Sequence, residues 1–238
     1  MDTTTLTALV GFAAVLGFSH TLMGPDHYLP FVAMSRIGRW SLPKTVVITL
    51  ACGVGHVVGS VILGVLGIAL GAAVGKLEWF EGIRGNVAGW LLLGFGLAYT
   101  VWGIHRAIRN RPHTHRHVHA DGIAHAHRHG HVEDHAHVHA DDQKAVSMTP
   151  WILFTIFIFG PCEPLIPLLM YPAAKLSLWG VGLVALVFGV VTIATMTGIV
   201  VVAYLGLTKA AFFRLERYGH VAAGLVVTAC GAAIKLGL

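Results

Sequence analysis

The sequence predicts an all-α polytopic membrane protein with six transmembrane helices, built as a 3+3 inverted repeat with a broken first helix in each half. Of the 238 residues, 55% are hydrophobic and only 11% are charged, whereas soluble domains average about 25% charged residues. The mean hydropathy is +0.73. The breaks and the repeat are predicted by a shared pattern: "GPDHYLPF" at 24–31 and "GPCEPLIP" at 160–167 both place a Gly-Pro, a nearby acid and a second proline inside an apolar run.

Apolar runs of the length needed to cross a bilayer, about 20 residues, define the six predicted spans: 5–34, 45–74, 86–105, 149–173, 177–207 and 219–237. They divide the chain into a first three-helix repeat, a polar histidine-rich loop and a second three-helix repeat, at 1–105, 106–147 and 148–238. Halves with an odd number of spans must have opposite orientations. Transporters built in this way hold their substrate near the membrane midplane, where broken helices meet.

The basic residues predict the orientation in the membrane. Twelve of the sixteen lysines and arginines fall in the loops after the first, third and fifth spans. The positive-inside rule then predicts that the histidine-rich loop is cytoplasmic, that both termini lie outside, and that the protein resides in the cytoplasmic (inner) membrane. Because the basic residues act as topology signals, the net charge of +5 does not indicate a nucleic-acid partner.

Two acidic residues, Asp26 and Glu163, are predicted to lie deep within spans, each just after a Gly-Pro break. A charged side chain at the centre of a membrane helix costs about 2.5–3.5 kcal/mol. Non-helical backbone at that depth must be buried in protein or line a cavity. Since both costs occur at the same two places, we expect a functional site there.

The side chains near the two breaks favour a transition metal. The first half offers His20, Asp26 and His27, the second span adds His56, and the second half adds Cys162 and Glu163. Imidazole and thiolate ligands suit nickel, cobalt, zinc and copper, whereas magnesium and calcium prefer oxygen. An anion site would need a lysine or arginine deep in the spans, and we expect none apart from Lys235 near the last end. We therefore predict a divalent metal substrate and no organic cofactor.

Each predicted ligand also has a structural alternative. Adjacent Asp26 and His27 cannot share a helix face, so one can bind the ion while the other holds a neighbouring side chain in place. The direction of His20 is undetermined because it precedes the break. His56 could instead be a packing histidine, and Cys162 could be an inert buried thiol. Three further side chains could line the pathway, although threonines more often bond between helices: Thr192, Thr195 and Met196.

The polar loop contains eleven histidines, mostly in His-x-His steps. Such a tract suits low-specificity capture of nickel, zinc, cobalt or copper, and its affinity should fall below about pH 6.5 as the imidazoles become protonated. The structural alternative is a spacer. The predicted capture residues are His113, His115, His117, His119, His125, His127, His129, His131, His135, His137 and His139.

In these features the chain resembles the NicO-type nickel/cobalt transporters, a superfamily that includes urease-accessory nickel permeases and sulfite-exporter-like proteins. The matching pieces are "HTLMGPDH" at 20–27, "GVGHVVGS" at 53–60, the histidine-rich loop and "FGPCEPLIP" at 159–167. The resemblance implies metal recognition by His20, Asp26 and His27. Two details differ: five residues rather than four separate His20 from Asp26, and Glu163 stands where the exporters tend to have proline.

The predicted function is secondary transport of nickel or cobalt, with zinc next, rather than an enzymatic activity. No nucleotide-binding motif is present to drive pumping. The resemblance favours export over uptake, and either deep carboxylate could carry a proton in counter-exchange. The partners expected are metal ions, the lipid bilayer and protons, and the sequence is compatible with a homo-oligomer. The alternatives are a membrane thiol-electron carrier built around Cys162 and a sulfur-oxyanion exporter.

Overall fold

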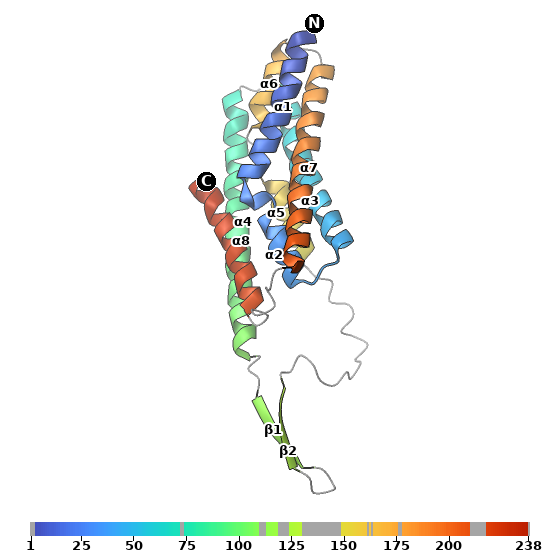
Figure 1. The fold of residues 1–238 in the computed structure, drawn as a ribbon. Coiled ribbons are helices and arrows are strands. Elements are labelled where there is room, and N and C mark those ends of the chain that lie inside the picture. The colour runs from blue at the N-terminus through green and yellow to red at the C-terminus, as the bar shows by residue number, and fades with distance from the viewer. Residues whose placement is uncertain are drawn as a thin grey trace.

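The computed structural model describes residues 3–71, 74–109, 113–118, 124–129, 149–160, 162, 164–175, 178–209 and 218–237. Its main body is a bundle of helices (Figure 1). Five of these helices are long and apolar enough to cross a membrane: α1, α3, α4, α7 and α8. The chain is therefore an integral membrane protein with an all-helical membrane part.

The predicted spans correspond to helices in the following order. The first is α1 (Thr3–Met23), followed by the short 3-10 helix η1 (Pro25–His27) and α2 (Leu29–Ile37). Next come α3 (Leu42–Ala69) and α4 (Val74–Arg109), and then α5 (Thr149–Phe159) and α6 (Leu165–Lys175). The last two are α7 (Leu178–Lys209) and α8 (Gly219–Leu236). Figure 1 shows that the start of α1 and the end of α4 lie at opposite ends of the bundle. We call these the Thr3 end and the Arg109 end, after the first residue of α1 and the last residue of α4.

Helix breaks occur at both Gly-Pro motifs, as predicted. Proline cannot donate a backbone hydrogen bond and its ring disrupts the preceding helical turn, so α1 ends at Met23, directly before Gly24 and Pro25. In the second motif α5 ends at Phe159, and α6 begins only at Leu165. Each of these two helices has 11 residues, which is too short to cross a bilayer alone.

The third predicted span was wrong at its beginning, because α4 starts at Val74 rather than near residue 86 and runs for 36 residues. The charges at 76–84 suggested a loop, but Glu81 is completely buried and forms an ion pair with Arg84. Opposite charges three residues apart lie on the same helix face. The expectations that only Asp26 and Glu163 are deep acids, and that no lysine or arginine lies deep in a span apart from Lys235, are therefore corrected.

The helices pack in a consistent set of pairs. The most extensive contact is between α4 and α8, α1 packs against α7, and α3 packs against α5, α6 and α7. Glycines allow the α4–α8 pair to approach closely: a Cβ atom added to Gly96 would collide with the backbone of Thr228, and one added to Gly231 would collide with the backbone of Leu93. Small residues commonly allow membrane helices to approach in this way.

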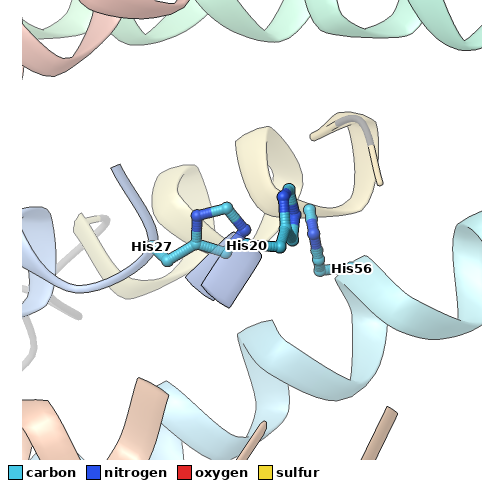
Figure 2. A group of neighbouring side chains, drawn as sticks. All are labelled: His20, His27 and His56. Atoms are coloured by element: carbon cyan, nitrogen blue, oxygen red, sulfur yellow. The ribbon is translucent and has the colours of Figure 1, made fainter. Parts of the chain in front are cut away.

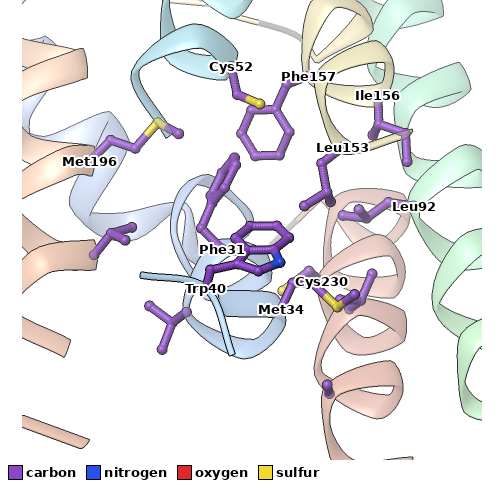
Figure 3. Packing of buried hydrophobic residues seen from close by; sticks show 14 residues of the cluster. Phe31, Met34, Trp40, Cys52, Leu92, Leu153, Ile156, Phe157, Met196 and Cys230 are labelled. Carbon is purple, nitrogen blue, oxygen red and sulfur yellow. The ribbon is translucent and has the colours of Figure 1, made fainter. Parts of the chain in front are cut away.

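Two apolar clusters form the core on either side of the breaks. The Arg109-side cluster includes Phe31, Trp40, Phe157 and Val200 (Figure 3). The Thr3-side cluster includes Ala13, Cys162, Leu165, Val184 and Phe188. On α7, for example, Val181, Val184 and Phe188 belong to the Thr3-side cluster, whereas Met196 and Val200 belong to the Arg109-side cluster. The level between the clusters is therefore the level of the two breaks.

Within the histidine-rich segment, the structure has two short strands, β1 (His113–Val118) and β2 (Ala124–His129). They pair antiparallel, with His113, His115 and His117 opposite His129, His127 and His125.

Candidate metal centre

Three of the predicted metal ligands, His20, His27 and His56, lie together at the level of the breaks (Figure 2). A nitrogen from each ring lies within 4.8 Å of the corresponding nitrogens of the other two. The ring centroids of His20 and His27 are 4.7 Å apart, and those of His27 and His56 are 5.1 Å apart. We call this group the tri-histidine centre.

The first break places two of these histidines. His20 is in the last turn of α1, and His27 ends the 3-10 helix that follows the break. Three local backbone bonds shape this connection: Gly24 N–H donates to His20 O at 3.0 Å, His27 N–H donates to Gly24 O at 3.0 Å, and Tyr28 N–H donates to Pro25 O at 3.3 Å. Without the break, the α-helix would continue and the two rings could not turn toward each other from opposite sides.

His56 comes from the middle of the continuous helix α3 and faces the second break. Its ring centroid is 6.3 Å from that of Phe157 on α5. A Cβ atom on Gly160, the first residue after α5, would be only 2.8 Å from Nδ1 of His56. The imidazole therefore fills the space that a larger residue would need at position 160.

Hydrogen bonding orients His27. Its Nδ1 lies 3.1 Å from the carbonyl oxygen of Gly24 and 3.3 Å from Oδ1 of Asp26. Both neighbours are acceptors, so Nδ1 carries the proton and a neutral His27 presents the lone pair of Nε2. Metal-binding histidines are commonly oriented in this way by a carboxylate or a backbone carbonyl on the other nitrogen.

Four other ring nitrogens are buried and have no hydrogen-bond partner within the described part of the chain. They are Nε2 of His20, Nε2 of His27, and both Nδ1 and Nε2 of His56. His27 and His56 are buried, with only 3% and 4% of their surface exposed. Leaving a buried polar group without a partner is costly, so three such rings facing one point indicate a site for a ligand that accepts nitrogen lone pairs.

A divalent transition metal fits this donor set. Zinc sites often use three histidines and leave a position open, and nickel, cobalt and copper also bind imidazole. Tetrahedral metal–nitrogen bonds of 2.0–2.1 Å place ligand nitrogens about 3.3 Å apart. Since the present separations reach 4.8 Å, the rings would have to move closer together to coordinate an ion.

The other predicted ligands occupy different positions. Asp26 contacts His27 and is not grouped with the three ring nitrogens. Cys162 is fully buried in the Thr3-side cluster, and its backbone N–H donates to Oε2 of Glu81 at 3.2 Å. Glu163 lies outside the described residues. Direct coordination by these three residues remains a prediction.

The predicted pathway residues lie on α7 and also remain predictions. Thr192 is fully buried and its Oγ1 has no partner among the described residues. Met196 belongs to the Arg109-side cluster, and Thr195 is partly exposed. In the histidine-rich segment, five of the predicted capture residues are outside the described residues: His119, His131, His135, His137 and His139.

Sequence reasoning missed the buried pair of Glu81 and Arg84 on α4. Arg84 Nη1 contacts Oε1 of Glu81, and it also donates to Oγ of Ser60 at 3.0 Å. The signal was present in the sequence, because opposite charges three residues apart within an otherwise apolar segment can pair on one helix face.

Comparisons with protein-family models, with curated proteins and with solved structures found no match for this chain.

Proposed function

We propose that this protein is a secondary transporter of a divalent transition metal ion, with nickel or cobalt preferred and zinc next, and that the tri-histidine centre is its substrate site. The observation that carries this proposal is the convergence of unpartnered nitrogens from His20, His27 and His56 at the level of the helix breaks. A buried site at a broken helix is typical of secondary transporters.

The packing of the helices supports an inverted repeat of six spans. In this arrangement α5 and α6 together form the fourth span, as α1 and α2 form the first. The contact of α1 with α7 then corresponds to the contact of α5 with α3, while α3 with α7 and α4 with α8 pair the equivalent helices of the two halves. In Figure 1, α1 descends from the Thr3 end to its break, whereas α5 and α6 ascend toward that end.

In the proposed mechanism, the ion exchanges part of its water shell for Nε2 of His20, Nε2 of His27 and one nitrogen of His56. Asp26 and the Gly24 carbonyl hold His27 in the required tautomer. The apolar clusters on the two sides of the centre close it from both ends of the bundle. Alternate loosening of each cluster would expose the ion to one side and then the other. Protonation of Asp26 could release the ion by freeing His27.

The charge distribution supports the proposed orientation. Arg36 lies in the last turn of α2, Arg39 follows α2, Lys44 lies in the first turn of α3, and Arg106 and Arg109 end α4, all at the Arg109 end. By the positive-inside rule this end, with the histidine-rich segment, is cytoplasmic, and the Thr3 end lies outside. We favour export from the cytoplasm, with the loop histidines collecting the ion.

The structure also bears on the alternatives. All three cysteines are free, with Cys162 in the Thr3-side cluster and Cys52 and Cys230 in the Arg109-side cluster. A dithiol cycle built around Cys162 would need a second cysteine beside it, whereas the other two cysteines belong to the opposite cluster. Arg84 is a buried cation of the kind that an oxyanion exporter needs, but its described hydrogen bonds go to protein acceptors. The tri-histidine centre favours the metal transporter, in line with the resemblance to NicO-type proteins.

The test uses the purified full-length protein, with Co²⁺, Ni²⁺ and Zn²⁺ titration in detergent and flux of the same three ions in liposomes. We expect His27→Ala to abolish both signals. Asp26→Asn should weaken Co²⁺ binding by about 10–100-fold, as is common when a group that orients a ligand is lost.

The matched control is His220→Ala, because His220 lies on α8 with Nδ1 2.9 Å from the Tyr99 hydroxyl and outside the tri-histidine centre. It should leave binding and flux unchanged. Wild-type protein that neither binds nor transports any of the three metals would overturn the proposal.

A further inference from the structure

The ion pair of Glu81 and Arg84 lies outside the tri-histidine centre and has no part in the mechanism above. Glu81 is completely buried, and the Arg84 side chain is 14% exposed. Both lie on one face of α4. Burying two charges carries a desolvation cost that their attraction does not always repay, so their other bonds indicate what the pair does.

Those bonds join α4 to α3 and to both sides of the second break. Arg84 Nη1 donates to Ser60 Oγ on α3, and Nη2 donates to the carbonyl oxygens of Ile158 at 2.8 Å and Gly160 at 3.4 Å. On the other side of the break, Oε2 of Glu81 accepts the N–H of Cys162 at 3.2 Å. The cation thus binds the end of α5, and the anion binds the segment that leads into α6.

The second break needs such partners because a helix end leaves carbonyl and N–H groups without intrahelical bonds, and a bilayer supplies no water to bind them. The first break is closed by bonds within its own backbone, such as Gly24 N–H to His20 O and His27 N–H to Gly24 O. The second break also has backbone bonds of its own, from Gly160 N–H to Phe157 O and from Leu165 N–H to Cys162 O. It is held in addition by two side chains of α4, which lies far from it in the sequence.

The same bonds position both neighbours of His56. Gly160, whose carbonyl Arg84 contacts, lies against the His56 ring. Ser60, which Arg84 also contacts, lies one helical turn after His56 on α3. Movement of the break away from α3 would therefore remove the contact that places the ring.

We propose that Glu81 and Arg84 are positioning residues that set the metal affinity of the tri-histidine centre by holding the second break against His56. This inference rests on the proposed function. It predicts that loss of either charged group weakens metal binding. A purely electrostatic influence on a bound cation predicts opposite effects, since removing Glu81 would weaken binding and removing Arg84 would strengthen it.

The experiment compares Glu81→Gln, Arg84→Gln and Arg84→Lys by Co²⁺ titration of purified full-length protein. We expect both glutamine variants to bind at least about tenfold more weakly and to change the visible absorption spectrum of bound Co²⁺, which reports ligand geometry. Arg84→Lys should bind Co²⁺ more weakly than wild type, with an affinity at or above that of Arg84→Gln, because an ammonium group cannot reproduce the guanidinium fork. Glu78→Gln is the matched control, since Glu78 is exposed on the same helix, and it should bind like wild type.

The outcomes separate the two proposals. Wild-type protein that neither binds nor transports Ni²⁺, Co²⁺ or Zn²⁺ refutes the proposed function, and this inference with it. If wild type binds and folded Arg84→Gln binds equally well or more tightly, only the positioning role is overturned. If a single variant fails to fold, the double variant Glu81→Gln/Arg84→Gln is tested in its place, because it leaves no unpaired charge. A double variant that binds Co²⁺ with the affinity and spectrum of wild type would also overturn the positioning role.

Discussion

Each helix break places a glycine against a ring of the tri-histidine centre. A Cβ atom on Gly24 would be 2.6 Å from Nδ1 of His27, and one on Gly160 would be 2.8 Å from Nδ1 of His56. The glycine of each Gly-Pro motif therefore makes room for an imidazole, besides ending a helix. This explains at the residue level why the breaks and the histidines occur together.

The first prediction concerns Gly160→Ala. The new methyl group would collide with His56 and would lie 3.1 Å from the Phe157 carbonyl oxygen, so the ring must turn away from His20 and His27. We expect weaker Co²⁺ binding with the protein still folded, measured by titration and by thermal unfolding in detergent. In the control variant Gly182→Ala, the added Cβ has no described atom within 4 Å. This variant should bind Co²⁺ as wild type does. Equal affinities for the two variants would contradict the prediction.

At the level of the elements, the close pairing of α4 with α8 depends on particular glycines. Gly96 faces the Thr228 backbone, whereas Gly94, two residues earlier on the same helix, has no described atom within 4 Å of an added Cβ. We predict that Gly96→Ala destabilises the protein by about 1–3 kcal/mol, as overpacking usually does, and that Gly94→Ala does not. Thermal unfolding in detergent measures both. A smaller loss for Gly96→Ala than for Gly94→Ala would show that the helices are not packed in this way.

The histidine-rich segment is a separate element from the bundle that holds the centre. Deleting residues 113–139 should reduce the rate of Ni²⁺ or Co²⁺ transport at low metal concentration without abolishing it, because the tri-histidine centre remains. The number of ions bound at saturation should also fall. Imidazoles bind metal only when neutral. The differences in transport rate and in ions bound between wild type and the deletion variant should therefore shrink as the pH falls below about 6.5.

Flux in liposomes and equilibrium dialysis at pH 7.5 and pH 5.5 check the prediction. A deletion variant without any transport at saturating metal would mean that the segment is part of the translocation site itself.

In the whole molecule, the two apolar clusters close the centre from both ends. On the Arg109 side, the rings of Phe31 and Phe157 form an edge-to-face pair with centroids 4.7 Å apart, and Cys52 is buried in the same cluster (Figure 3). This arrangement corresponds to an occluded state of the proposed transport cycle, in which the substrate site faces neither side.

We predict that Phe157→Ala opens the Arg109-side cluster to solvent. In a Cys162→Ser/Cys230→Ser background, Cys52 should become reactive toward a membrane-impermeant thiol reagent applied from the Arg109 side. The substitution should cost about 3–5 kcal/mol of stability, so retained Co²⁺ binding must be shown alongside. Phe18→Ala, on the exposed surface of α1, should leave Cys52 protected. If Cys52 remains unreactive in folded Phe157→Ala, then Phe157 is not the residue that closes the Arg109 side of the centre.

Much of this fold could be predicted because apolar length and proline are local signals. The runs at 45–74, 177–207 and 219–237 became α3, α7 and α8 to within a few residues, and both Gly-Pro motifs became breaks. The start of α4 was not predictable in the same way. The spacing allows Glu81 to pair with Arg84 on one helix face. Whether that pair is buried within the helix depends on Ser60 and the second break, which are brought to it only in the folded chain.

Composition and the cost of burying polar groups are properties of each segment, so the sequence alone predicts a membrane protein with potential metal ligands near its helix breaks. Which of those side chains meet depends on the tertiary structure. It brought His56 to His20 and His27, and placed Asp26 beside Nδ1 of His27. It also gave the second break a buried ion pair from α4. Those contacts depend on how the helices of the two halves pack, and spacing along a single chain carries no information about that packing.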